Sequence, residues 1–179
     1  RFGRPTIVDE ADGSSDRAPR PCEWNILALG KFGGREMNYH SDLDLVFLYE
    51  ADGYTETTHD GGQERTTNQH FFSELGQRII KRMSRSGVFG RLYEVDARLR
   101  PTGKSGVLAT SLVEFERYFT EGDGQLWERQ ALCKARVVHG TPRLAEKTER
   151  IVRRAAFESP WRDADAEEIR RMRRRLEAN

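Results

Sequence analysis

Two aspartates within an apolar run, Asp42 and Asp44, are the residues best suited to chemistry in this sequence. Alternate residues of a strand point to the same side, so both carboxylates would face one way while Leu43 and Leu45 face a core. Like charges side by side repel, which raises the pKa of one carboxyl unless a cation compensates. A ligand set made only of oxygen suits the hard ions Mg²⁺ or Mn²⁺. The pair therefore predicts a metal site.

A third carboxylate, Asp96, ends another expected strand at residues 91–96. Three carboxylates on neighbouring strands could hold two ions about 4 Å apart, which would activate a hydroxyl nucleophile and stabilise charge on a phosphate. The alternative is that Asp42 and Asp44 face solvent on an edge strand, because charges are common on surfaces. Their position inside a hydrophobic run is costly without a compensating role, which favours the metal site.

Glycines and basic residues near these carboxylates are candidates for binding phosphate. Gly33 and Gly34 follow an expected strand and would let the backbone approach a triphosphate closely, with Lys31 to neutralise it. An ordinary turn after the strand is the alternative. The basic residues that follow Asp96 could also contact phosphate, or could be surface residues: Arg98, Arg100 and Lys104.

The segment Gly103-Lys104-Ser105 is not a P-loop. That motif needs a glycine five positions before Gly103, and Arg98 stands there.

The elements expected around these residues divide the chain into a strand-rich first half and a helical second half. Strands are expected at 26–29, 42–49 and 91–96, and hydrophobic periodicity predicts helices at 67–84, 111–120, 125–136, 142–157 and 164–177. We expect a polar linker or disordered end over 1–22, a core over 23–110 and a helical extension over 111–179.

Composition limits the class of protein. The 179 residues are 36% hydrophobic and 33% charged, as in a soluble globular domain. There is no apolar run of about 20 residues and no signal peptide, so we expect a cytoplasmic protein that does not bind a membrane. The formal net charge of only +1 argues against nucleic acid as a partner.

Three blocks around the candidate residues, 29–34, 41–47 and 95–101, together resemble the bifunctional glutamine synthetase adenylyltransferase/adenylyl-removing family, with further similarity over 127–137. The resemblance implies an α+β fold, the mixed sheet of the polymerase beta-like nucleotidyltransferases, followed by a helical segment. It implies that Asp42, Asp44 and Asp96 are the catalytic and metal-binding carboxylates. The superfamily's usual Gly-Ser pair is replaced by Gly33-Gly34, with Ser41 as the nearby hydroxyl, so the hydroxyl contact to phosphate stays open.

The resemblance also implies the reaction. One domain of such an enzyme transfers AMP from ATP to a tyrosine of glutamine synthetase, and a second removes it by phosphorolysis to give ADP. The segments 93–98, 130–132 and 136–138 are more similar to the adenylylating C-terminal half, and the deadenylylating half is the alternative. Implied partners are glutamine synthetase and, through the full-length enzyme, a PII-type signal protein. A non-catalytic docking domain for either protein is the second alternative.

Overall fold

The computed structural model of the chain describes residues 2–8, 18–39, 41–57, 63–88, 90–91, 93–121, 124–158, 160 and 163–177. A mixed five-stranded sheet lies at its centre. Its strands are β3 (Trp24–Ala28), β4 (Leu43–Tyr49), β8 (Val95–Asp96), β9 (Ala109–Ser111) and β10 (Arg136–His139). The order is β10-β3-β4-β8, and β9 also pairs with β4. β4 is antiparallel to β3 and parallel to β8 and β9, so it pairs with three of the other four strands.

β4 is apolar along almost its whole length because both of its faces are covered. Leu45 and Phe47 belong to one buried cluster, whereas Val46 and Leu48 belong to another on the opposite face. A strand buried on both sides reads as a continuous hydrophobic run instead of an alternating one. Asp44 is the half-buried exception within it.

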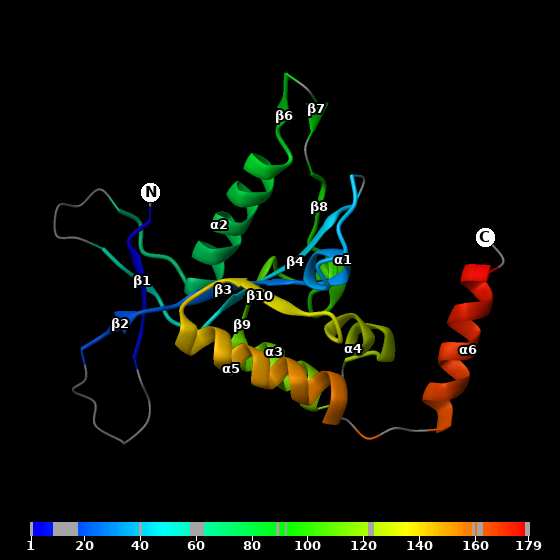
Figure 1. Cartoon of the computed structure of the whole chain (residues 1–179). Coiled ribbons are helices and arrows are strands. Elements are labelled where there is room, and N and C mark those ends of the chain that lie inside the picture. The colour runs from blue at the N-terminus through cyan, green and yellow to red at the C-terminus, as the bar shows by residue number, and fades with distance from the viewer. Residues whose placement is uncertain are drawn as a thin grey trace.

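One face of the sheet is covered by α2 (Asn68–Met83), close to the expected helix at 67–84. The helix begins where the Thr67 side chain accepts a hydrogen bond from the His70 backbone N–H at 3.2 Å, a favourable N-cap. Gly76 lets the helix approach the strand, since a methyl group there would lie 3.3 Å from the Phe47 ring. A short hairpin follows, made by β6 (Ser86–Gly87) and β7 (Gly90–Arg91), and Figure 1 shows it beyond the end of α2 and away from the sheet.

The opposite face is covered by α3 (Leu112–Thr120), α4 (Leu126–Leu132) and α5 (Pro142–Arg153). Their buried side chains share one cluster with Leu27 and Val46 of the sheet. The buried Asn25 side chain of β3 donates a hydrogen bond to Thr148 of α5 at 2.7 Å. The residues expected as a separate extension after 110 therefore complete the core of the sheet, down to Ala155.

The remaining elements are short or terminal. They are α1 (Gly30–Gly33), a 3₁₀ turn η1 (Gly103–Ser105), a π-type turn η2 (Arg154–Glu158) and α6 (Asp163–Glu177). The helix expected at 125–136 ends at Leu132, because the chain enters β10 at Arg136. Within the described residues, none of the helices has the length and apolar character needed to span a membrane.

The described residues of the N-terminal region form strands, which corrects the expected linker or disordered end over 1–22. A second sheet joins β1 (Arg4–Ile7), β2 (Arg20–Pro21) and β5 (Thr55–Glu56) in the order β2-β1-β5. Thr6, Ile7 and Cys22 are buried. Polar composition concealed this sheet because its strands contribute few apolar side chains and pair with a segment about 50 residues away. Residues 1 and 9–17 lie outside the described part of the chain.

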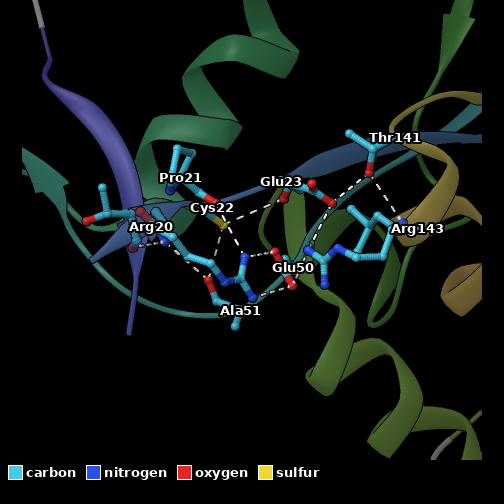
Figure 2. A network of polar contacts seen from close by, with 11 residues as sticks. Arg20, Pro21, Cys22, Glu23, Glu50, Ala51, Thr141 and Arg143 are labelled. Carbon is cyan, nitrogen blue, oxygen red and sulfur yellow. Dashed lines mark hydrogen bonds and ion pairs between the residues drawn. The ribbon is translucent and has the colours of Figure 1, made fainter. Parts of the chain in front are cut away.

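A buried carboxylate joins this N-terminal sheet to α5. The Arg20 guanidinium donates two hydrogen bonds of 2.8 Å to Glu50, and Arg143 donates another of 2.6 Å (Figure 2). Arg143 and the Thr141 hydroxyl also bind Glu23, at 2.9 and 2.6 Å. Burial alone would raise the pKa of Glu50, but the two guanidinium groups outweigh burial and lower it. Glu50 is therefore a charged link between β2, the end of β4 and the start of α5.

Candidate active site

Asp44 and Asp96 stand side by side in the sheet. β4 and β8 run parallel, and the register pairs Leu43 with Val95 and Asp44 with Asp96. Residues paired on neighbouring strands point to the same face, and neighbouring strands lie about 4.8 Å apart. Two residues that lie 52 positions apart in the sequence are thus brought together by the pairing of two short strand segments.

Asp42 precedes the sheet. β4 begins at Leu43, so Asp42 lies exposed in the preceding loop instead of within the strand as expected. Leu43 is buried in the core, which leaves Asp42 and Asp44 displayed away from it. The negative charge of Asp42 acts on Asp44 and contributes to raising its pKa. The three predicted carboxylates therefore gather in one region, with Asp44 at the centre.

The electrostatic environment of Asp44 is unfavourable for a lone carboxylate. Burial is the largest cause of the raised pKa of Asp44, followed by the charges of Asp96 and Asp42, while Arg98 lowers it. Desolvation and like charges both disfavour ionisation, and a bound cation would relieve both. The site is therefore one in which positive charge is strongly favoured.

Arg98 supplies positive charge within the structure itself. Its Nε lies 2.9 and 2.7 Å from the two oxygens of Asp96, its Nη2 also contacts Asp96, and its backbone N–H donates to Asp96 Oδ1 at 2.8 Å. These hydrogen bonds to Asp96 raise the pKa of Arg98. The Arg98 side chain is 61% exposed, so it can turn towards a ligand without unpacking the core.

The other two predicted basic contacts after Asp96 differ from Arg98. The Arg100 guanidinium binds the backbone carbonyls of Ala97 and of Gly106, the latter at 3.2 Å, and burial lowers its pKa. Arg100 therefore holds the loop between Asp96 and β9 in shape. The side chain of Lys104 lies outside the described part of the structure, although its backbone forms part of η1.

The turn at residues 29–34, here called the glycine turn, contacts Asp44 directly. The Leu29 backbone N–H donates to the Asp44 carbonyl at 2.9 Å. Gly30 follows with φ +51°, and a methyl group there would lie only 2.2 Å from Asp44 Oδ2. Position 30 therefore needs glycine for two reasons: the left-handed backbone and the closeness of the carboxylate. The sequence placed Gly30 in the turn without indicating this contact.

Gly33, expected to face phosphate, is enclosed by backbone. A methyl group at Gly33 would lie 2.1 Å from the Lys134 carbonyl and 2.6 Å from the Ala28 carbonyl. At Gly34 the nearest atoms would be side-chain atoms of Lys134 and Glu36, at 3.2 and 3.3 Å. Gly33 therefore serves the packing of the turn against the segment before β10, and Gly34 is bordered by the side chains of Lys134 and Glu36 instead of by backbone.

The predicted residue Lys31 lies within the glycine turn, and the predicted residue Ser41 directly precedes Asp42. Lys31 is exposed in α1. The Ser41 hydroxyl donates to the Asn38 side-chain oxygen at 2.6 Å and accepts from the Asn38 backbone N–H at 3.1 Å. Ser41 therefore closes the turn that delivers Asp42, and its hydroxyl is engaged there.

Arg136 is a positioning residue of the turn that the sequence did not single out. Its Nη2 donates to the Phe32 carbonyl at 2.9 Å and its Nε to the Gly33 carbonyl at 3.1 Å. The guanidinium carbon also lies 5.6 Å from the centre of the Phe32 ring. The only sequence signal was its place in the segment 127–137 that resembles the family, because the contact spans more than 100 residues.

The donor chemistry fits a hard divalent cation, since the gathered ligands are carboxylate oxygens in a site that favours positive charge. Asp44 and Asp96 are adjacent, and Asp42 reaches them electrostatically. Among the described residues, however, no group of three or more acidic, histidine or cysteine side chains is close enough to hold an ion. Because Arg98 binds Asp96, the exposed side chains at this site must rotate before the three carboxylates could bind a metal ion together.

Comparison of the sequence with known proteins identifies the family of this chain. The family model described as Glutamate-ammonia ligase adenylyltransferase matches residues 8–151. A protein of Thioalkalivibrio sulfidiphilus named bifunctional glutamine synthetase adenylyltransferase/adenylyl-removing enzyme is 42% identical over 178 residues, which is 98% of this chain and 17% of that protein. A protein of the same name from Pseudomonas aeruginosa is 42% identical over 183 residues, covering 100% of this chain and 17% of that protein.

A third relative with this name, from Psychromonas ingrahamii, is 47% identical over 113 residues, which is 63% of this chain and 11% of that protein. The chain thus spans about a sixth of the length of the curated relatives it matches. The family match includes the glycine turn and all three aspartates, on the mixed α+β fold that the resemblance implied. The chain belongs to the glutamate-ammonia ligase adenylyltransferase family.

Proposed function

We propose that this chain carries the nucleotidyltransfer site of an enzyme that moves AMP between ATP and a tyrosine of glutamine synthetase. The observation that supports it most strongly is the register of β4 and β8, which pairs Asp44 with Asp96 beside Asp42. The names of its relatives add the substrate class. We favour the adenylylating direction because the segments 93–98 and 130–132 are more similar to the adenylylating half of such enzymes.

In this mechanism Asp42, Asp44 and Asp96 would hold two divalent ions, Mg²⁺ or Mn²⁺. When bound, such ions neutralise the carboxylates and stabilise charge on the transferring phosphate. Arg98 leaves Asp96 and turns to the triphosphate, for which its exposed side chain is suited. Gly34 and Lys31 lie at the glycine turn, where phosphate oxygens can approach the backbone.

The transfer itself needs a deprotonated acceptor. A tyrosine hydroxyl has an ordinary pKa of about 10, so help from a base is useful at neutral pH. Asp96, once released by Arg98, accepts that proton. The tyrosine oxygen then forms a bond to the α-phosphorus of ATP, the bond from that phosphorus to the bridging oxygen breaks, and pyrophosphate leaves with the electron pair.

The test is transfer of label from α-³²P-ATP to glutamine synthetase, with Mg²⁺ or Mn²⁺ present. The unmodified chain should label a tyrosine, and Asp96→Asn should reduce the rate by at least about 10²-fold while ATP binding is largely kept, since one acid–base group contributes about that much. Full activity of Asp96→Asn would exclude the assigned role.

Deadenylylation is the second candidate, because the relatives are named as bifunctional enzymes. The same carboxylates would then position inorganic phosphate to attack the tyrosyl-AMP bond, releasing ADP and the free tyrosine. Incubation of adenylylated glutamine synthetase with phosphate separates the two directions, because only this candidate produces ADP. The third candidate is a non-catalytic docking domain for glutamine synthetase or a PII-type protein. Such a domain would catalyse neither reaction and would show no Mg²⁺-dependent ATP binding by calorimetry.

A further inference from the structure

The end of α2 and the hairpin after it form a strongly basic, exposed projection. We call it the basic arm and define it by its five cationic residues, all of them exposed: Arg78, Lys81, Arg82, Arg85 and Arg91. Figure 1 shows the end of α2 and the β6–β7 hairpin rising away from the sheet. At the hairpin turn, Val88 is 97% exposed.

The charge of the basic arm is not balanced locally. Between Leu75 and Tyr93 the sequence contains five basic residues and no aspartate or glutamate. Arg91 pairs with Glu94, whereas the other four form no ion pair with any residue that the structure describes. The whole chain carries a formal charge of only +1, so the remainder is net acidic and the arm is a local concentration of positive charge.

The other arginine-rich segment shows what an ordinary solvated surface looks like in this protein. In α6, acidic residues precede and interleave with the arginines, and Arg173 pairs with Glu177 at 2.8 Å. Acids early and bases late in a helix are favoured by the helix dipole. The dipole accounts for Lys81 and Arg82 in the last turn of α2 but not for Arg85 or Arg91, which lie beyond the helix.

The basic arm is covalently continuous with the candidate active site. Arg91 ends β7 five residues before Asp96 in β8, and the Leu43 backbone N–H, next to Asp42, binds the Glu94 carbonyl at 2.8 Å. An extended chain rises about 3.3 Å per residue, so Arg91 lies within roughly 17 Å of Asp96. A folded protein that presents a tyrosine to Asp96 is large enough to touch the arm at the same time.

We propose that the basic arm docks an acidic surface of the acceptor protein and so positions the acceptor tyrosine at the carboxylates. This inference rests on the proposed function, because the acceptor is taken to be glutamine synthetase. Complementary charge mainly accelerates association and selects partners, and its effect is weakened by salt. The arm would therefore act on capture of the protein acceptor and not on binding of ATP.

The test compares binding of glutamine synthetase to the full 179-residue chain and two charge-reversed variants, by surface plasmon resonance at low and physiological salt. The first variant is R82E with R85E in the arm. The matched control is R170E with R174E in α6, which makes the same change of charge on exposed side chains. We expect the arm variant to associate about tenfold more slowly at low salt, with the gap narrowing as salt rises. The α6 variant should bind as the unmodified chain does.

A milder pair, R82Q with R85Q, guards against a loss of folding, and should reduce association in the same direction by a smaller factor. Calorimetric binding of Mg²⁺–ATP should be equal in all variants. Equal association of the arm variant and the unmodified chain would overturn this inference and leave the proposed function intact. An equal loss in the α6 variant, or loss of RNA binding with unchanged glutamine synthetase binding, would overturn it too.

Arm-dependent binding without AMP transfer in either direction would instead support the docking surface and remove the proposed function. If the unmodified chain did not bind glutamine synthetase, both proposals would fall.

Discussion

Replacing Gly30 by alanine separates the position of the Asp44 carboxylate from the stability of the fold. Two effects are expected. Alanine at φ +51° costs about 1–2 kcal/mol of folding free energy, because the left-handed region is unfavourable for a residue with a β-carbon. The new methyl group would also lie 2.2 Å from Asp44 Oδ2, at least about 1 Å inside a normal contact, so the carboxylate must rotate away. A displacement of about 1 Å at a reacting site can reduce the rate by about 10²-fold.

Gly103 offers a matched control for the backbone effect. It has φ +58°, and a methyl group there would have only one neighbour, the Arg98 carbonyl at an ordinary 3.8 Å. Gly103→Ala should therefore lose a similar 1–2 kcal/mol without moving Asp44. Urea denaturation gives the stability of both variants, and calorimetry with Mn²⁺ together with the ATP-labelling assay reports on the site.

The expected result is similar loss of stability in both variants, with weakened Mn²⁺ binding and about 10²-fold lower transfer in Gly30→Ala alone. If Gly30→Ala bound Mn²⁺ and transferred AMP as well as Gly103→Ala, the contact between Gly30 and Asp44 would have no bearing on the site. A much larger loss of stability in Gly30→Ala would show that Asp44 cannot rotate, and that the methyl group displaces the backbone instead.

Three further outcomes are expected. Arg98→Gln should strengthen Mn²⁺ binding by up to about fivefold, the range of an exposed ion pair, and should weaken ATP binding. If the substitution weakened the binding of both Mn²⁺ and ATP, Arg98 would not compete with the metal for Asp96. Asp44→Asn should stabilise the chain at pH 7, because the pKa of Asp44 is raised in the folded state and ionisation of this carboxyl therefore costs folding free energy. The gain in stability should shrink as the pH falls towards 3.8, the ordinary pKa of the group. A gain that stays the same in thermal melts over this pH range would refute the prediction. Glu50→Gln should cost about 2 kcal/mol at pH 7, because two guanidinium groups lose their partner, and the difference should shrink below pH 4.5, since the folded pKa is lowered; a constant difference in urea titrations at pH 7 and 3.5 would contradict this.

The parts of the fold visible in the sequence are those that local pattern determines. The apolar run of β4 predicted a buried strand, and the spacing of Phe72, Leu75 and Ile79 predicted α2, because burial imposes the periodicity of each element. The three aspartates could be selected because a charge next to a buried strand is costly. A single strand was expected at 91–96, whereas the structure has β7 (Gly90–Arg91) in a hairpin and β8 (Val95–Asp96) beside β4. The register that pairs Asp44 with Asp96 depends on contact between distant segments, which local pattern does not determine.

The structural features that the sequence could not indicate depend mostly on contacts with other segments of the chain. Arg100 and Ser41 looked like phosphate ligands by position, but each is engaged with nearby backbone or side chains. Gly33 looked like a phosphate glycine and is enclosed by carbonyls from two other segments. Arg136 holds the turn across more than 100 residues. Residue type and spacing in the sequence identify candidate site residues, and the contacts of each residue in the folded structure indicate its role.

The Glu50 cluster determines where this chain tolerates a cut. A protein trimmed to start at Cys22 would retain the whole central sheet and all three aspartates, and composition alone would recommend it. It would lose Arg20, and with it two of the three hydrogen bonds that Glu50 accepts from guanidinium groups, and it would strip β5 of its partner strand. A carboxylate whose side chain is 6% exposed would then depend on Arg143 alone. β1 and Arg20 are therefore part of the folded structure, and a cut at Cys22 should destabilise it.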